Sequence, residues 1–269
     1  MAGKALSAKR IFGNKLTFTF ALLGAVIMLF IFVPLMKTIF GSSPDMLFEA
    51  LLDEQVRSAI WLSIYTALLA TIVGAVFGVP LAYLLARYNF PGKRTIEGLV
   101  DVPIVIPHTA AGIALLFVFG RNFFAGKVFN FLGITFIDSV AGIVIAVLFV
   151  SIPFLIDAAK EGFKSVDVRL EKVSRTLGAS PLQAFFTVTL PLAWKSIFAG
   201  NIMMWARGIS EFGAVMIIAY HPTVASILVA DRFEAYGLNY ARPVAALLIL
   251  ICLVIFIGLR AFTYRSDKP

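Results

Sequence analysis

Residues 166–191 read VDVRLEKVSRTLGASPLQAFFTVTLP and form the longest stretch that separates two strongly apolar segments of the chain. Four of its apolar residues recur at the helical spacing i, i+4, i+7 and i+11: Val166, Leu170, Val173 and Leu177. Residues at these intervals stack on one side of an α-helix, while Arg169 and Lys172 fall on another side. The stretch therefore predicts a short amphipathic helix.

Both ends of this helix carry the residues that usually mark helix ends. Asp167 can cap its start, and Gly178 stands where a left-handed residue often ends a helix. Glu171 and Arg175 lie four residues apart and are expected to pair. Residues 180–183 (SPLQ) then combine a cap, a proline at the first helical position and a glutamine that can complete a capping box. The stretch is therefore predicted to form a helix, a glycine turn and a second helix.

The spacing leaves two interpretations of the amphipathic helix open. Such a helix can lie on the membrane surface with its apolar face in the lipid. It can also present that face to a partner protein as a docking surface. Periodicity alone does not decide between them.

The composition indicates an integral membrane protein. Hydrophobic residues make up 60% of the chain and charged residues 14%, whereas globular domains have about half and about a quarter. The net charge of +8 is divided among short segments between apolar runs, as membrane topology requires, so we exclude nucleic acid as a partner. The single cysteine, Cys252, lies in an apolar run, which excludes a disulfide framework or a thiolate metal cluster.

Six apolar segments are long enough to cross a bilayer as helices. They cover about residues 16–36, 59–86, 101–120, 139–156, 192–220 and 243–262. Sixteen of the 23 Lys and Arg residues fall in the segments on one side of these spans or in the adjoining span ends, which predicts that both termini are cytoplasmic. We expect three parts: the N-terminal segment with the first span and first external loop (1–57), a core of five spans (58–262) and a cytoplasmic tail (263–269).

Several segments predict irregular or close-packed structure. The third span begins DVPIVIPHTAAG, and its two prolines predict a broken or kinked entrance. The fifth span exceeds what a bilayer needs, so we expect it to tilt or to project into the cytoplasm. In the second span, Gly74 and Gly78 have the small-xxx-small spacing that lets another helix approach closely. The external loop 221–241 is expected to contain a short helix within TVASILVADRF.

Ionisable residues within the spans are the candidates for a substrate pathway or gate. Arg207 and Glu211 lie four residues apart, so they share a face of a continuous helix. They either form an ion pair that holds the bundle together or, with Ser210, line the substrate route. His108, beside Thr109, is either a residue of the helix mouth or a further part of that route. No second His or Cys is spaced to complete a metal site, so no metal is expected.

The sequence gives no sign of catalysis. It contains no G-x-x-x-x-G-K-[ST] loop for nucleotide phosphates, so energy from ATP must come from another chain. Asp157, Glu161 and Asp167 are spread over a predicted cytoplasmic loop and do not form the acidic cluster of a membrane enzyme. An ion-coupled secondary transporter is the alternative of another class, for which Glu211 is the candidate coupling carboxylate.

The loop resembles the cytoplasmic signature of binding-protein-dependent ABC importer permeases of type I. Gly178 and residues 188–191 (VTLP) match the family's glycine and its final apolar-x-Leu-Pro. Residues 172–174 read Lys-Val-Ser where the family usually has Glu-Ala-Ala, and Glu171 stands one residue early. The segments ARGISEFGAV (206–215) and DVPIVIPHTAAG are also similar to oxyanion importer permeases, with the molybdate/tungstate permeases as the nearest match.

The resemblance implies a homodimer of six-span, all-α subunits in a prokaryotic cell membrane. Two separate cytoplasmic ATPase subunits would bind ATP and Mg²⁺, and this chain would bind no cofactor. An extracytoplasmic binding protein would deliver a tetrahedral oxyanion, molybdate or tungstate, with sulfate or thiosulfate as the alternative. The helix at 166–178 would be the coupling helix that contacts the ATPase, through Val166, Arg169, Leu170, Glu171, Val173, Leu177 and Gly178.

Overall fold

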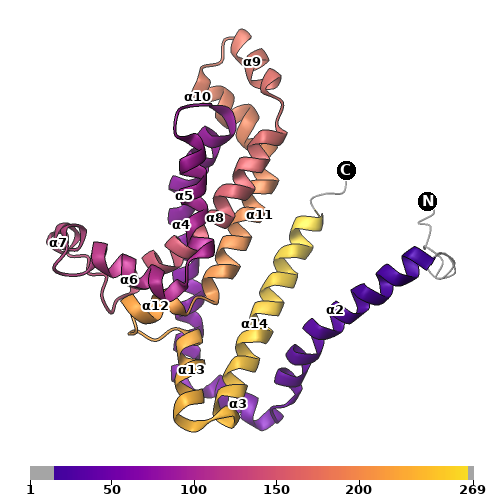
Figure 1. Ribbon diagram of the computed structural model, residues 1–269, viewed down its shortest axis with the longest axis vertical. Helices are drawn as coiled ribbons and strands as arrows, with labels where there is room; N and C mark the ends of the chain where they lie inside the picture. Colours follow the sequence, from indigo (N-terminus) through magenta and orange to yellow (C-terminus); the bar gives the residue numbers. More distant parts are fainter. Residues whose placement is uncertain (1–14, 266–269) are drawn as a thin grey trace.

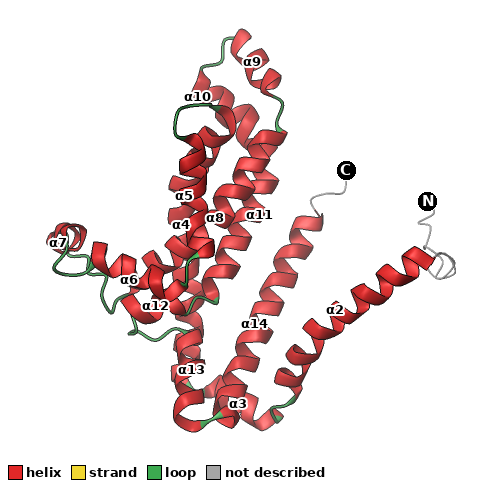
Figure 2. Cartoon of the chain, viewed as in Figure 1, coloured by secondary structure: helices red, strands yellow, loops and turns green. Residues whose placement is uncertain are grey.

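The computed structural model describes residues 15–265, with side chains to residue 258, and this part of the chain consists of helices and loops (Figure 2). The helices are α2 (Lys15–Phe40), α3 (Pro44–Leu52), α4 (Glu54–Arg87), α5 (Lys93–Val105), α6 (His108–Phe119), α7 (Phe124–Phe131), α8 (Val140–Ser165), α9 (Val168–Thr176), α10 (Pro181–Ala184), the π-helical turn η1 (Phe185–Thr189), α11 (Leu190–Ile209), α12 (Gly213–Ile218), α13 (Ala225–Tyr236) and α14 (Leu238–Arg265). No strand forms within 15–265, which confirms the predicted all-α fold. The predicted basic segment before residue 15 and the end of the tail lie outside the described residues.

Helices α4, α8 and α11 form the centre of the bundle and run side by side in Figure 1. Small residues let these helices approach closely. A Cβ atom on Gly74 would lie 2.5 Å from the Met204 side chain of α11, and one on Gly78 would lie 3.3 Å from Ile156 of α8. Both glycines of the predicted pair therefore face a neighbouring helix, as the small-xxx-small spacing indicates.

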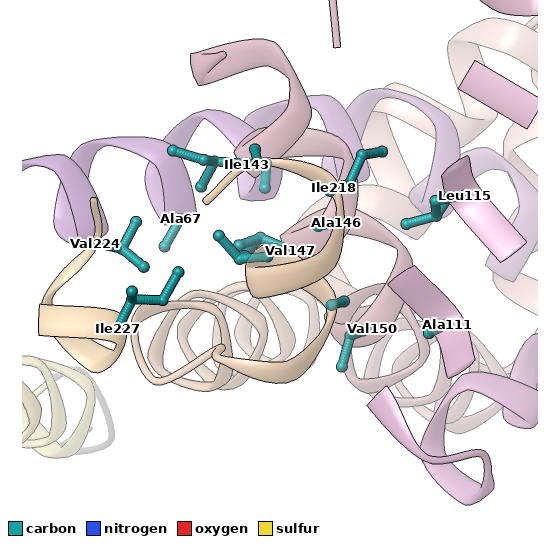
Figure 3. Close-up of a cluster of buried hydrophobic side chains, with 14 of the residues drawn as sticks. Ala67, Ala111, Leu115, Ile143, Ala146, Val147, Val150, Ile218, Val224 and Ile227 are labelled. Atoms are coloured by element: carbon teal, nitrogen blue, oxygen red, sulfur yellow. The ribbon is translucent and has the colours of Figure 1, made fainter. Parts of the chain in front are cut away.

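A cluster of buried side chains joins these spans to the short helices α6, α12 and α13 (Figure 3). Ala67 of α4, Val147 of α8, Ile218 of α12 and Ile227 of α13 are each at most 2% exposed. Contacts of this density fix side chains in single arrangements. The short helices are therefore part of the same core as the spans.

Among the described residues, five helices are long and apolar enough to cross a membrane, and a sixth crossing follows if the bent pair α5–α6 counts as one span. The bend between α5 and α6 is 117°, which confirms the predicted break in the third span. It falls at Ile106 and Pro107, because proline disfavours helical backbone in the residue before it and donates no hydrogen bond. The chain is an all-α, multi-pass membrane protein.

The fifth span differs from the single long helix predicted over about residues 192–220. Helix α11 ends at Ile209, residues 210–212 interrupt the helix, and α12 is a separate short helix. In the other direction the helix is continuous through η1 back to Pro181. The prediction was wrong at the C-terminal end of the span. Apolar periodicity does not reveal that the Glu211 side chain accepts a hydrogen bond from Ala214 N, at 3.0 Å, in the first turn of α12.

The fourth span extends beyond its predicted end near residue 156, because α8 continues to Ser165. Asp157 and Glu161, which we expected in a loop, lie on this helix. Lys160 pairs with Asp157 at 2.9 Å and Lys164 with Glu161 at 2.7 Å, each three residues apart. These ion pairs stabilise the last turns of α8, which connect the core to the polar stretch at 166–191.

Helices α3 and α13 close the end of the bundle opposite α9 (Figure 1). Helix α13 confirms the helix predicted within the loop 221–241 and is longer than expected. Asp53 caps α4 by accepting a hydrogen bond from Gln55 N at 2.8 Å, and it accepts a second from Arg232 Nη2 of α13 at 2.6 Å. The hydrogen bond from Arg232 holds the pKa of Asp53 below its usual value.

The substitution Gly112→Ala tests the close contact between α6 and α12. The added Cβ would lie 2.8 Å from the carbonyl oxygen of Ala214 and 2.7 Å from Ile217, so the two helices would have to separate. Overpacking of this kind costs about 1–3 kcal/mol, and we expect the thermal unfolding midpoint in detergent to fall by several degrees. Gly98→Ala in α5 is the matched control, because its Cβ would meet no atom within 4 Å. Equal losses in both variants would contradict the close contact.

Candidate functional site

The polar stretch forms the predicted helix, glycine turn and second helix. Asp167 caps α9 by accepting a hydrogen bond from Arg169 N at 2.9 Å, and Gly178 follows with a left-handed φ of +96°. Ser180 and Gln183 form a reciprocal capping box, with hydrogen bonds of 2.8 and 3.2 Å. These features depend on neighbouring residues in the chain, so the sequence identified them correctly.

The apolar face of α9 is exposed. Leu170, Val173 and Leu177 are 47%, 55% and 84% exposed, and no residue of α9 is buried. Val166 does not share this face, which corrects the prediction for that residue. It follows the last residue of α8, is 5% exposed and packs with Leu85 in a buried cluster. Helix α9 lies at one end of the molecule, beyond the ends of α4, α8 and α11 (Figure 1).

Glu171 does not make the predicted pair with Arg175 and instead contacts α4. Its Oε1 atom accepts hydrogen bonds from Arg87 Nε at 2.8 Å and from Thr189 Oγ1 of η1 at 2.8 Å. Arg87 Nη2 lies 2.7 Å from the same oxygen and donates to the carbonyl oxygen of Val166 at 3.0 Å. We call Glu171, Arg87, Thr189 and Tyr83 together the Glu171 joint. No local sequence pattern points to the role of Arg87, because its partner is 84 residues away.

A second polar site joins the breaks in the third and fifth spans. Glu211 Oε2 lies 3.0 Å from Arg207 Nη2 and 3.0 Å from His108 Nδ1, and Arg207 Nη2 lies 2.8 Å from His108 Nδ1. Neither contact of Oε2 has hydrogen-bond geometry. The contact with Arg207 is an ion pair, and the contact with His108 is one only when the imidazole is protonated. The Glu211 side chain is 1% exposed, while those of Arg207 and His108 are 26% and 31% exposed. We call these three residues the charged cluster.

The charged cluster corrects one expectation and refines another. The predicted pair of Arg207 and Glu211 is present, but it does not lie on one face of a continuous helix, because Glu211 follows the end of α11. His108, the first residue of α6, contacts both Arg207 and Glu211 and so belongs to the same cluster. Thr109 and Ser210 are exposed beside it, and Ser210 Oγ donates to the carbonyl oxygen of Arg207 at 3.1 Å. Within the described part of the chain, no group of His, Cys, Asp or Glu residues could hold a metal ion.

The two polar sites lie at different levels of the bundle. A Cβ on Gly208, next to Arg207, would lie 3.1 Å from Ala67, which marks the level of the charged cluster on α4. Arg87 lies on the last turn of the same helix. At a rise of 1.5 Å per residue, the two levels are about 30 Å apart. This separation is comparable to the thickness of a hydrocarbon core.

The profile of the family described as "Binding-protein-dependent transport system inner membrane component" matches residues 76–268. The chain belongs to this family. The resemblance found in the loop at 166–191 is therefore confirmed at the level of the family.

Individual relatives agree with this assignment. The permease is 45% identical over 253 residues to the "Molybdate/tungstate transport system permease protein WtpB" of Thermococcus kodakarensis, an alignment that covers 93% of this chain and 97% of the relative. It is 31% identical over 211 residues to the "Probable sulfate transport system permease protein cysT" of Marchantia polymorpha, covering 77% and 73% of the two chains. Its fold is similar to a chain in a crystal structure of a bacterial ABC transporter that imports alginate, with a TM-score of 0.73, 17% identity, and 97% and 99% coverage.

The ion pair in the charged cluster is tested by removing its cation. We expect Arg207→Ala to destabilise the protein by about 3 kcal/mol, because it removes the guanidinium that pairs with the buried Glu211 carboxylate. The double variant Arg207→Ala/Glu211→Gln should recover part of this loss, since the amide keeps an acceptor for Ala214 N without a buried charge. Thermal unfolding in detergent measures both effects. Strictly additive losses would show that Arg207 and Glu211 do not pair.

Proposed function

We propose that the chain is the membrane permease of an ABC importer that carries molybdate or tungstate. The exposed apolar face of α9 is the observation on which the proposal rests, because Leu170, Val173 and Leu177 are 47%, 55% and 84% exposed. An apolar helix face of this kind fits a groove on a partner protein. The 45% identity to the molybdate/tungstate permease of T. kodakarensis supports that anion over sulfate, for which the relative is 31% identical.

In this proposal, partner proteins supply ATP hydrolysis and deliver the oxyanion. Two ATPase subunits bind ATP and Mg²⁺ and dock on the α9 helices of a permease homodimer, through Arg169, Leu170, Val173, Leu177 and Gly178. Glu171 faces α4 and takes part in coupling from that side. An extracytoplasmic binding protein delivers the oxyanion at the opposite end, near α3 and α13. The permease is a pathway and not an enzyme, since its sequence has no Walker A loop.

The proposed orientation places α9 and both termini in the cytoplasm of a prokaryotic cell. Sixteen of the 23 Lys and Arg residues fall in the segments and span ends on that side, and cytoplasmic loops carry an excess of these residues. The same orientation puts the charged cluster in the outer half of the membrane.

The charged cluster is the proposed gate of the pathway. Glu211 is fully buried and neutralises Arg207, so the exposed parts of Arg207 and His108 are the groups available to a passing oxyanion. Thr109 and Ser210 add exposed hydroxyl groups beside them. Because Glu211 offsets the positive charge of Arg207, the pair can contact a divalent anion without binding it tightly, and weak binding is what a pathway needs.

Docking on α9 is tested by replacing its apolar face. In the variant Leu170→Asp/Val173→Asp, two carboxylates would have to enter the apolar contact, and we expect the ATPase to be lost when the permease is purified by affinity. Leu132→Asp is the matched control, because Leu132 is 64% exposed and lies outside the loop at 166–191. Undiminished recovery of the ATPase with the α9 variant would count decisively against the docking role.

The identity of the anion is tested by competition. Uptake of radiolabelled molybdate into proteoliposomes that contain permease, ATPase and binding protein should be suppressed by unlabelled tungstate at equal concentration. A similar excess of sulfate should have little effect. The reverse order of inhibition would replace molybdate/tungstate with sulfate as the substrate.

A further inference from the structure

Helix α9 is attached to the membrane helices in an unusual way. None of its residues is buried, so apolar packing contributes little to holding it in place. Its covalent connections are the short segments around Asp167 and Gly178. The strongest side-chain contact between α9 and a membrane-spanning helix in the described residues is the ion pair of Glu171 with Arg87.

We infer that the Glu171 joint transmits movement of α9 to α4, which makes Glu171 and Arg87 positioning residues for coupled transport. The inference rests on the proposed function, in which an ATPase moves α9. It adds the statement that a polar joint, and not apolar packing, carries that movement into the spans.

The Glu171 carboxylate has partners from two other segments. Arg87 and Tyr83 belong to the last two turns of α4, and Thr189 ends the turn η1 that leads into α11. Arg87 and Thr189 donate to Oε1, and Tyr83 OH donates to Oε2 at 3.4 Å. One carboxylate therefore links α9 both to α4 and to the start of the α11 span.

Burial makes this joint stronger than an exposed ion pair. The side chains of Arg87 and Glu171 are 7% and 14% exposed, and the hydroxyl-bearing Thr189 is 0% exposed. Attraction between charges rises as water is excluded, whereas exposed pairs contribute little. The pair of Lys164 with Glu161 on α8 is of the exposed kind, with side chains 44% and 66% exposed.

The partners of Glu171 are themselves held by the core. The Tyr83 ring packs edge-on against Phe163 of α8 at 5.4 Å and against Phe185 of η1 at 4.9 Å between ring centroids. Arg87 Nη2 also donates to the carbonyl oxygen of Val166, at the end of α8. A displacement of α9 therefore pulls on side chains that are fixed in the packed bundle, and the bundle moves with it as a unit.

Two interpretations of the joint make different predictions. If Arg87 and Glu171 serve folding alone, a single substitution is harmful because it leaves a buried charge without a partner. Removing both charges, as in Arg87→Ala/Glu171→Ala, should then restore function. If the pair transmits movement, the double variant lacks the joint and should remain uncoupled.

The experiment uses the full chain assembled with ATPase and binding protein in proteoliposomes. We expect Glu171→Ala, Arg87→Ala and the double variant each to raise the number of ATP molecules hydrolysed per molybdate taken up by about tenfold, because α9 no longer moves α4. Thr189→Val, which removes one hydrogen bond and leaves no charge unpaired, should raise the ratio by a smaller factor. The control Lys164→Ala should leave the ratio unchanged.

Several outcomes would overturn the inference. Recovery of the ratio in the double variant would assign the joint to folding, and an unchanged ratio in all variants would leave it without a role in transport.

A second measurement does not depend on transport. In the detergent-solubilised chain, Glu171→Ala should speed amide hydrogen exchange in α9 by about tenfold relative to Lys164→Ala. Unchanged exchange would overturn the inference whether or not the complex transports an oxyanion. Absence of oxyanion uptake by the unsubstituted complex would instead refute the proposed function.

Discussion

The structure depends on one constraint, which is that backbone N–H and C=O groups in a hydrocarbon environment need partners inside the protein. Continuous helices satisfy it along α4, α8 and α11. The two interrupted spans, at Ile106–Pro107 and at residues 210–212, satisfy it because the breaks meet each other. Glu211 accepts from the α12 backbone through one oxygen and contacts Arg207 and His108 through the other.

The same constraint gives the molecule two polar sites separated by a rigid apolar middle. The Glu171 joint lies where the spans leave the apolar core, and the charged cluster lies about 30 Å away along α4. Between them the contacts of α4, α8 and α11 involve glycines at which a neighbouring helix leaves little or no room for a side chain, such as Gly74 and Gly208. Helices packed so closely resist independent sliding, so a movement imposed at α9 reaches the cluster through the whole bundle.

Local sequence features predicted local structure well. The caps at Asp167 and Ser180, the left-handed Gly178 and the break before His108 each follow from residue types within a few positions of one another. The six apolar segments and their order were also evident, because a membrane span requires a long apolar run whatever its neighbours are.

Contacts between distant residues were not predictable in the same way. Glu171 was expected to pair with Arg175 on its own helix, whereas the folded chain offers a more buried guanidinium, Arg87, from a helix 84 residues earlier. Val166 has the correct spacing for the docking face but is removed from it by the end of α8. Glu211 similarly has helical spacing from Arg207, yet the helix ends before it, because its side chain is used to start α12.

The central claim is that this permease is a pathway driven by ATP hydrolysis on another chain, and energisation of reconstituted vesicles tests it most directly. Vesicles that contain the permease alone, given an imposed proton or sodium gradient, should accumulate no molybdate. Vesicles that also contain the ATPase and are supplied with binding protein, molybdate and ATP should accumulate it against its gradient. Accumulation driven by the ion gradient in the permease-only vesicles, without nucleotide, would contradict the account.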